Sequence, residues 1–261
     1  MSALDLDRLS PAVRPAGKNA GTQSWRDLLF VHWALPVEAV RPLVPPDIEL
    51  DPWDGKAWVG LVPFQMKRIR PSWLPQAFAM DFLELNARTY VHHRGRPAVW
   101  FFSLDASSWL AVRAARTGWS LPYFHAKMAT SREGNRIRYD STRHAHGGAT
   151  HHAHGGATHH ESAVRFEVDY EVGERLGPSV AGTFEHFLLE RYLLLSTRKG
   201  AILEGQVHHP PYVAHRAQVH RIEEGLIAAA GMPAPSRAPD AVHFSPGVDV
   251  EVFGPAPVEG A

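Results

Sequence analysis

Most segments of the chain alternate between apolar and polar residues with a period of two, the pattern of strands with one face in a core and one in water. Residues 164–172 show it most clearly. One face carries Val164, Phe166, Val168, Tyr170 and Val172, and the other carries Arg165, Glu167, Asp169 and Glu171. We therefore predict a half-buried antiparallel strand in this segment.

Further strands are predicted by the same alternation or by short apolar runs between turn residues. They cover residues 57–66, 82–91, 98–106, 191–196 and 201–209. Helical periodicity is confined to short pieces, at residues 36–44, 107–117, 183–190 and about 222–231. These elements predict an α+β fold made mainly of antiparallel sheet, with a few short packed helices.

The alternation in residues 82–91 is the most informative about a site. One face carries Leu83, Leu85, Ala87, Thr89 and Val91, and the other carries Phe82, Glu84, Asn86, Arg88 and Tyr90. A polar face usually meets solvent, but it can also line a cavity. Residues 57–66 are apolar on both faces, and residues 98–106 are rich in aromatic side chains. We therefore do not expect residues 82–91, if they lie between these two strands, to expose one face to solvent. A barrel with a partly polar lumen accommodates these strands.

Composition narrows the classes of protein. The 261 residues suffice for one domain with a full core, and 27 basic against 27 acidic residues provide no net field for nucleic acid or an anionic membrane. The absence of cysteine excludes disulfides and thiolate metal sites. No signal peptide is evident at the N-terminus, and no apolar run is long enough for a membrane helix. We expect a cytoplasmic protein.

A histidine-rich repeat occupies residues 144–160, where His-Ala-His-Gly-Gly-Ala-Thr-His is written twice with one further histidine. Such tracts are typical of metal-binding segments. Alanine and glycine, however, offer no side chains to orient the imidazoles. With strands predicted on both sides, we interpret residues 143–161 as an expanded hairpin tip that binds transition metals weakly, and we predict no functional metal site.

Six segments, taken in order, resemble the YqjF-like family, a bacterial domain of unknown function with the acetoacetate decarboxylase-like fold. They are residues 25–66 (beginning "WRDLLFVHWALP"), 82–93 ("FLELNARTYVHH"), 96–117 (beginning "RPAVWFFSLDA"), 121–128 ("LPYFHAKM"), 184–196 ("FEHFLLERYLLLS") and 207–212 ("VHHPPY"). The resemblance implies a single domain over residues 25–253, in which a curved antiparallel sheet closes into a barrel around an internal pocket. The polar composition of residues 1–24 predicts a flexible arm before this domain, and residues 254–261 would be a tail.

The resemblance does not supply a reaction. Acetoacetate decarboxylases form a Schiff base through a lysine whose pKa is lowered by an adjacent lysine and by desolvation. The five lysines here, Lys18, Lys56, Lys67, Lys127 and Lys199, are not adjacent to one another. We therefore expect no Schiff-base lysine and no cofactor.

The resemblance does imply a glutamate and an arginine near the ligand, and we match Glu84 and Arg88 to these roles. We expect them to form a buried pair, with Asn86 and Tyr90 beside them. The pocket wall is predicted to include Trp100, Phe102 and His209.

Two hypotheses about function stay open. In the first, Arg88 anchors a carboxylate or enolate oxygen of a small keto acid and Glu84 acts as general acid and base. In the second, the same cavity holds an apolar or amphiphilic small molecule without converting it. Both predict a small-molecule partner, and neither decides between a monomer and an assembly of identical copies.

Overall fold

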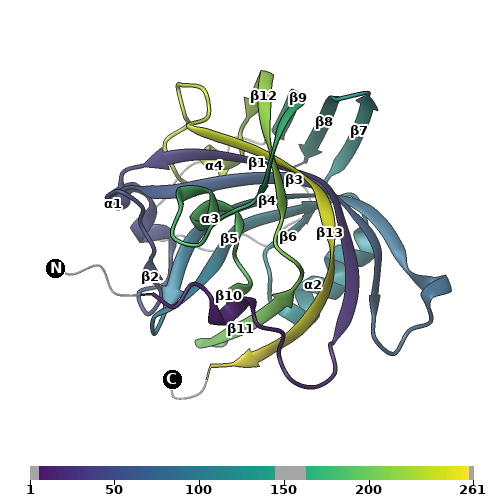
Figure 1. Ribbon diagram of the computed structural model, residues 1–261. Helices are drawn as coiled ribbons and strands as arrows, with labels where there is room; N and C mark the ends of the chain where they lie inside the picture. Colours follow the sequence, from purple (N-terminus) through teal and green to yellow (C-terminus); the bar gives the residue numbers. More distant parts are fainter. Residues whose placement is uncertain (1–5, 145–162, 259–261) are drawn as a thin grey trace.

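A sheet of thirteen strands forms most of the computed structural model, which describes residues 6–144 and 163–258 (Figure 1). Seven of these strands close into a barrel in the order β1-β3-β4-β5-β10-β11-β13, because β13 pairs with β1. They are β1 (Gly21–Leu35), β3 (Ala57–Pro71), β4 (Met80–His93), β5 (Arg96–Ala106), β10 (Leu193–Arg198), β11 (Ala201–His208) and β13 (Ala241–Pro257). All neighbours are antiparallel except β5 and β10. The predicted antiparallel barrel is confirmed.

The sheet continues beyond the barrel at one end of β13. There it adds β12 (Val213–Glu224), β9 (Val164–Pro178), β8 (Arg136–Arg143) and β7 (Lys127–Glu133), at the top of Figure 1. Two short strands, β2 (Glu49–Leu50) and β6 (Tyr123–His125), pair with β4 and β5. The predicted strand at residues 164–172 is the first half of β9.

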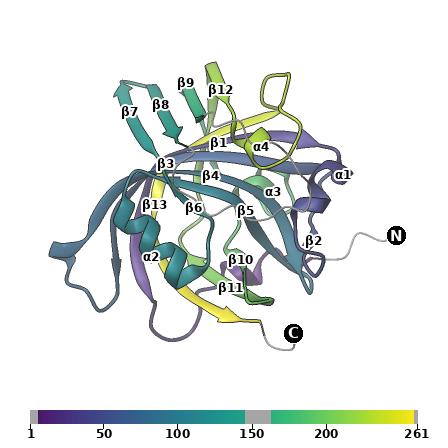
Figure 2. The same cartoon turned by 180° about the vertical axis from the view of Figure 1, so that it is seen from behind.

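The helices are short, as predicted. They are α1 (Val37–Val40), α2 (Trp109–Trp119), α3 (Phe184–Leu189) and α4 (Leu226–Ala229), with 3-10 turns at Ser10–Ala12, Arg41–Leu43 and Gln76–Phe78. The longest, α2, begins where the Ser108 hydroxyl accepts a hydrogen bond from the Ala111 amide, an ordinary N-cap. Figure 2 shows α2 beside β6, at the end of the barrel away from α4.

Two apolar cores explain why several strands have no solvent-exposed face. One lies between the barrel wall and the extension of the sheet, and it receives Leu85, Ala87 and Val91 from β4. The other lies inside the barrel, and it receives Phe82 and Tyr90 from the opposite face of the same strand. Because both faces of β4 are covered, its polar residues point into the protein.

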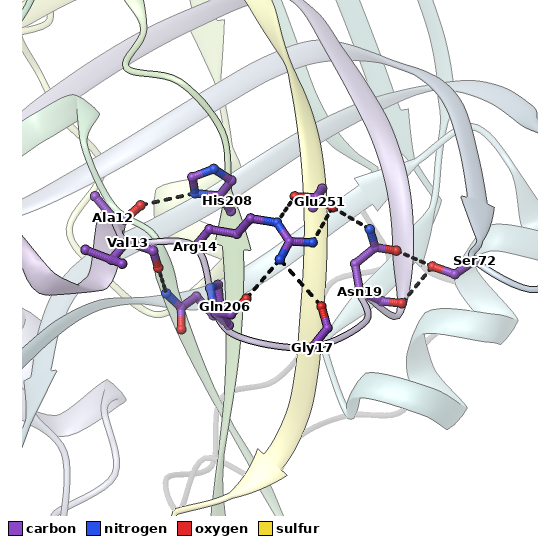
Figure 3. A network of polar contacts seen from close by, with 10 residues as sticks. Ala12, Val13, Arg14, Gly17, Asn19, Ser72, Gln206, His208 and Glu251 are labelled. Carbon is purple, nitrogen blue, oxygen red and sulfur yellow. Dashed lines mark hydrogen bonds and ion pairs between the residues drawn. The ribbon is translucent and has the colours of Figure 1, made fainter.

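Residues 6–24 differ from the expected flexible arm. The Arg14 guanidinium donates to both carboxylate oxygens of Glu251 on β13, at 2.6 and 2.8 Å, and Asn19 reaches the same carboxylate (Figure 3). Farther along the segment, β1 already begins at Gly21. Polar composition predicted mobility, but partners remote in sequence hold this segment on the barrel. At the other end, β13 continues past residue 253 to Pro257.

The histidine repeat lies outside the described residues, apart from His144. Its flanking strands, β8 and β9, pair antiparallel up to Arg143 and Val164, as a hairpin requires. The insert nevertheless starts later than predicted. Arg143 belongs to β8, and its guanidinium forms a 3.0 Å ion pair with the buried carboxylate of Asp105.

Candidate functional site

A cavity of about 440 Å³ lies inside the barrel and is lined by residues from all seven barrel strands and from α2. Its wall is mostly apolar. The charged residues that line it are Glu84, Arg88, Arg70 and Arg191, and Asn86 lies between the first two on β4. Three of the residues predicted from the alternation in β4 are therefore together in one cavity wall.

Glu84 is a buried carboxyl group in an apolar setting, with 3 % of its surface exposed. The Tyr123 hydroxyl donates a 2.9 Å hydrogen bond to Oε2, and the Tyr139 hydroxyl donates to the Glu84 backbone carbonyl at 2.8 Å. Burial raises the pKa of Glu84 to about 8, and the hydrogen bond from Tyr123 opposes this only in part. At neutral pH the side chain is mostly protonated, and it can exchange a proton near physiological pH.

Arg88 is a buried guanidinium without a carboxylate partner among the described residues. Its Nη2 donates a long 3.3 Å hydrogen bond to the Leu188 carbonyl, and Nε has no partner there. The group lies 5.6 Å from the centroid of the Phe30 ring and 5.7 Å from that of Tyr90. The expected pair with Glu84 is not formed, because four residues of extended strand separate their Cα atoms by about 13 Å.

Arg191, which the pattern analysis missed, adds a second guanidinium to the cavity wall. Its Nη2 lies 2.9 Å from Oδ2 of Asp51, and its Nε and Nη1 have no partner among the described residues. Arg8 occupies the same carboxylate with two hydrogen bonds of 2.6 and 2.7 Å. Burial lowers the pKa of Arg191 to about 10, so the group stays protonated at neutral pH.

These groups make one end of the cavity electropositive. Arg8 and Arg191 share the single carboxylate of Asp51, and Arg88 adds a third guanidinium that has no carboxylate partner among the described residues. The Tyr90 ring contacts both Arg88 and Arg191, whose guanidinium carbons lie 5.7 and 4.9 Å from its centroid. An unbalanced buried cation binds a carboxylate or enolate oxygen strongly, since a guanidinium presents paired N–H donors in one plane.

Asn86 and Tyr90 occupy different positions in this arrangement. Asn86 lines the cavity, and its buried Oδ1 has no hydrogen-bond partner among the described residues. Tyr90 lies behind the wall, where its hydroxyl donates to the Leu188 carbonyl at 2.6 Å and lies 2.7 Å from His32 Nε2. Burial lowers the pKa of His32 well below its usual value, so the ring is neutral. Tyr90 therefore supports Arg88 without lining the pocket.

Trp100 and Phe102 face away from the cavity, contrary to the prediction, and pack against the outer core. The cause is a β-bulge in β5. Arg88 pairs with Phe101 and Ala87 with Ser103, so Phe102 has no partner and the alternation changes phase. The cavity is instead lined by Val99, Phe101 and Leu104.

His209 also lies outside the lining. Its ring packs against Trp25, Tyr192 and Tyr212, with ring centroids 5.6, 4.7 and 4.7 Å away, and these three residues line the cavity in its place. Burial lowers the pKa of His209 to about 4. His209 therefore supports the aromatic wall as a neutral ring.

None of the five lysines lines the cavity. Lys67 pairs with Asp81 at 3.3 Å and keeps 39 % of its side chain exposed, and the other four are exposed. Within residues 6–144 and 163–258, no cluster of three or more His, Asp or Glu side chains is arranged to hold a metal ion. In the same ranges no helix has the length and apolar character needed to cross a membrane.

Solved structures with the same fold come from acetoacetate decarboxylase-like proteins. The enduracididine biosynthesis enzyme MppR, complexed with pyruvate, matches with a TM-score of 0.59 and 13 % identity over 93 % of this chain and 91 % of its own. An acetoacetate decarboxylase-like enzyme from Sphingomonas wittichii RW1 matches with a TM-score of 0.58 and 14 % identity over 95 % and 98 %. At such identities the likeness shows the fold alone.

Sequence relatives place the chain more closely. Residues 22–249 match the DUF2071 family, described as an uncharacterised conserved protein. The uncharacterised protein YqjF of Bacillus subtilis (strain 168) is 34 % identical over 229 residues, which cover 87 % of this chain and 88 % of YqjF. The chain therefore belongs to the YqjF-like DUF2071 family and has the acetoacetate decarboxylase-like fold.

Proposed function

We propose that this protein binds a small organic acid that carries a carbonyl group, such as a 2-oxo acid, and catalyses proton transfer at the carbon next to that carbonyl. One observation carries the proposal. A buried guanidinium without a carboxylate partner among the described residues, that of Arg88, lines the same cavity as Glu84, whose pKa is about 8.

Arg88 and Arg191 would hold the anionic end of the substrate. A planar guanidinium binds a carboxylate through two parallel hydrogen bonds, and the unpartnered Nε of Arg88 and Nη1 of Arg191 supply donors for it. Asp51 holds Arg191 in place, and Arg8 in turn fixes the Asp51 carboxylate. Because these charges are fixed before the ligand arrives, they also stabilise negative charge that develops on an enolate oxygen.

Glu84 would transfer the proton. Its ionised form removes a proton from the carbon next to the carbonyl, and the C–H electron pair forms a C=C bond while the carbonyl electrons move to oxygen. The neutral acid then returns a proton to the same carbon. A pKa of about 8 keeps both forms of Glu84 available near neutral pH.

Proteins with the same fold support a 2-oxo acid as the substrate class, but this chain differs from the decarboxylases in the residues that would carry the reaction. MppR is described in complex with pyruvate, a 2-oxo acid, and with a condensation product of pyruvate. In this chain no lysine lines the cavity, so the proposed chemistry does not pass through a Schiff base.

The alternative function is binding without turnover. The mostly apolar lining and the wide separation of Arg88 from Glu84 along β4 favour it, because a binding protein needs an anchor and a fitting wall but no acid at the reacting carbon. The two functions share the anion site and differ only in what Glu84 does.

Deuterium exchange decides between them. The protein is incubated with pyruvate or 2-oxobutanoate in D2O, and loss of the C3 proton signal is followed by NMR. We expect exchange that accelerates from pH 7 to pH 9, as Glu84 ionises, and that is lost in Glu84→Gln. Arg88→Met should raise the half-saturating substrate concentration at least tenfold. The control Arg165→Gln alters an exposed arginine and should change neither value.

Each outcome has a defined meaning. Binding by calorimetry with no exchange above the buffer rate would establish the alternative function. Exchange that persists in Glu84→Gln would refute the role of Glu84, and no binding of any organic acid would refute the proposal. Borohydride treatment with pyruvate should give no covalent adduct by intact mass, and a stoichiometric adduct would refute the route without a Schiff base.

A further inference from the structure

We propose that the ligand is an amphiphilic monoanion whose carboxylate lies at Arg88 and Arg191 and whose apolar chain extends through the barrel toward α2. This inference rests on the proposed anion site and adds the size and character of the rest of the ligand. It is carried by the distribution of charge along the cavity and by its volume.

Arg88 and Arg191 lie at one end of the cavity. Arg70, the third arginine of the lining, lies at the other end on β3, where it is half-buried and its Nη1 donates to the Leu74 carbonyl at 2.8 Å. On β4 the cavity wall runs from Arg88 through Asn86, Glu84 and Phe82 to Met80, a distance of about 26 Å at 3.3 Å per residue. Glu84 is mostly neutral at pH 7 because burial raises its pKa to about 8. Beyond Arg88 and Arg191, the middle of the cavity therefore holds no fixed charge that would repel an apolar chain.

The walls around this middle stretch are apolar on several strands. Phe64 on β3 lies opposite Glu84, and Met66 lies opposite Phe82. Further apolar lining comes from Leu28, Val62, Leu104, Leu121, Val207 and Val252. Such a wall binds methylene groups by removing them from water.

The far end is formed by α2 and by the outer ends of β3 and β4. Small residues on α2, Ala111, Ala114, Ala115 and Gly118, line the cavity there. Trp119 fits beside them because Gly205 has no side chain, and an added Cβ would lie 2.6 Å from the indole ring. Small side chains along one face of a helix leave room for a ligand to lie against it.

The volume argues for a chain of several carbons. A cavity of about 440 Å³ lies within the roughly 300–1,000 Å³ typical of sites for drug-sized ligands. A three-carbon acid held at Arg88 would contact few of the apolar residues that line the rest of the cavity.

Calorimetry with straight-chain monocarboxylates from butanoate to dodecanoate tests the inference. We expect affinity to rise about fourfold per added methylene until the chain fills the cavity, the factor that corresponds to about 0.8 kcal/mol per buried CH2. Primary alcohols of equal length should bind at least tenfold more weakly, and Arg88→Gln should remove this preference for the acid.

Substitutions on α2 locate the chain. Ala115→Trp fills the far end and should weaken decanoate at least tenfold while leaving butanoate unchanged. Ala114→Trp, at a more exposed lining position, gives a second test should the first variant not fold. Thr117→Trp lies on the same helix outside the lining and should have no effect.

The outcomes separate this inference from the proposed function. If short 2-oxo acids bind through Arg88 but affinity is independent of chain length, the amphiphilic ligand is refuted and the proposed function stands. Equal weakening of butanoate and decanoate by the α2 variants would likewise refute the placement of the chain. Failure of every carboxylate to bind would refute both.

Discussion

Replacing Glu84 by glutamine should stabilise the protein at neutral pH, although it removes a central residue of the site. Glutamine has nearly the same shape, and its amide oxygen can accept the hydrogen bond that Tyr123 donates to Oε2 at 2.9 Å. Unlike the carboxyl group, the amide of glutamine does not ionise in this pH range. The substitution therefore isolates the free energy of keeping a carboxyl group in the barrel.

The magnitude follows from the pKa. Burial raises the pKa of Glu84 from 4.5 to about 8, so between these values the unfolded chain releases a proton that the folded protein keeps. The contribution of Glu84 to the free energy of unfolding is then highest below pH 4.5 and falls by about 1.4 kcal/mol per pH unit as pH rises toward 8. At pH 7 the loss is about 3 kcal/mol. Glu84→Gln should recover this amount at pH 7 and none at pH 4.5.

Urea unfolding followed by tryptophan fluorescence measures this difference at pH 4.5, 6, 7 and 8. Asp105, whose pKa burial raises to about 6, contributes equally to both proteins and cancels in the comparison. The control Glu174→Gln removes a carboxyl with 73 % of its side chain exposed and should shift stability by less than about 0.5 kcal/mol at every pH. A constant difference between Glu84→Gln and the wild type across this range would refute a buried, protonated Glu84.

Three further predictions concern the surroundings of the cavity. Asp51→Asn leaves Arg8 and Arg191 without their carboxylate and should lower the free energy of unfolding by about 3–5 kcal/mol in urea titrations. The control Asp54→Asn, in the neighbouring exposed turn, should change it little, and equal effects of the two variants would contradict the ion pairs of Asp51 with Arg8 and Arg191. Phe101→Ala should alter ligand affinity in calorimetry, whereas Phe102→Ala, on the far side of the bulge, should leave it unchanged, and the reverse result would contradict the register of β5. Replacing residues 145–160 by an Asn-Gly turn should abolish retention on nickel resin without lowering the melting temperature; a large fall would mean that the repeat supports the fold.

Local sequence patterns predicted β3, β4, β5, β9, β10 and β11, the short helices and the polar face of β4, but not the long strands β1, β12 and β13. Alternation is a property of neighbouring residues, so the sharing of one face by Glu84, Asn86 and Arg88 was predicted without knowledge of the fold. The apolar character of residues 57–66 on both faces also indicated a central strand without a solvent-exposed face. The resemblance to a known family added barrel closure, which alternation cannot specify because it does not say which strands pair.

Only the tertiary structure decided which arginines form the charged end of the cavity and which side chains of β5 face the cavity. Arg191 lies between α3 and β10, where no periodicity assigns a direction to a side chain, and it reaches the cavity because Asp51, 140 residues away in sequence, holds it. The bulge opposite Arg88 arises from how two strands pair, so it reversed the predicted sides of Trp100 and Phe102. Tyr123 meets Glu84 only because β6 pairs with β5. In each case the deciding contact joins segments far apart in the chain, and such contacts form only when the barrel closes.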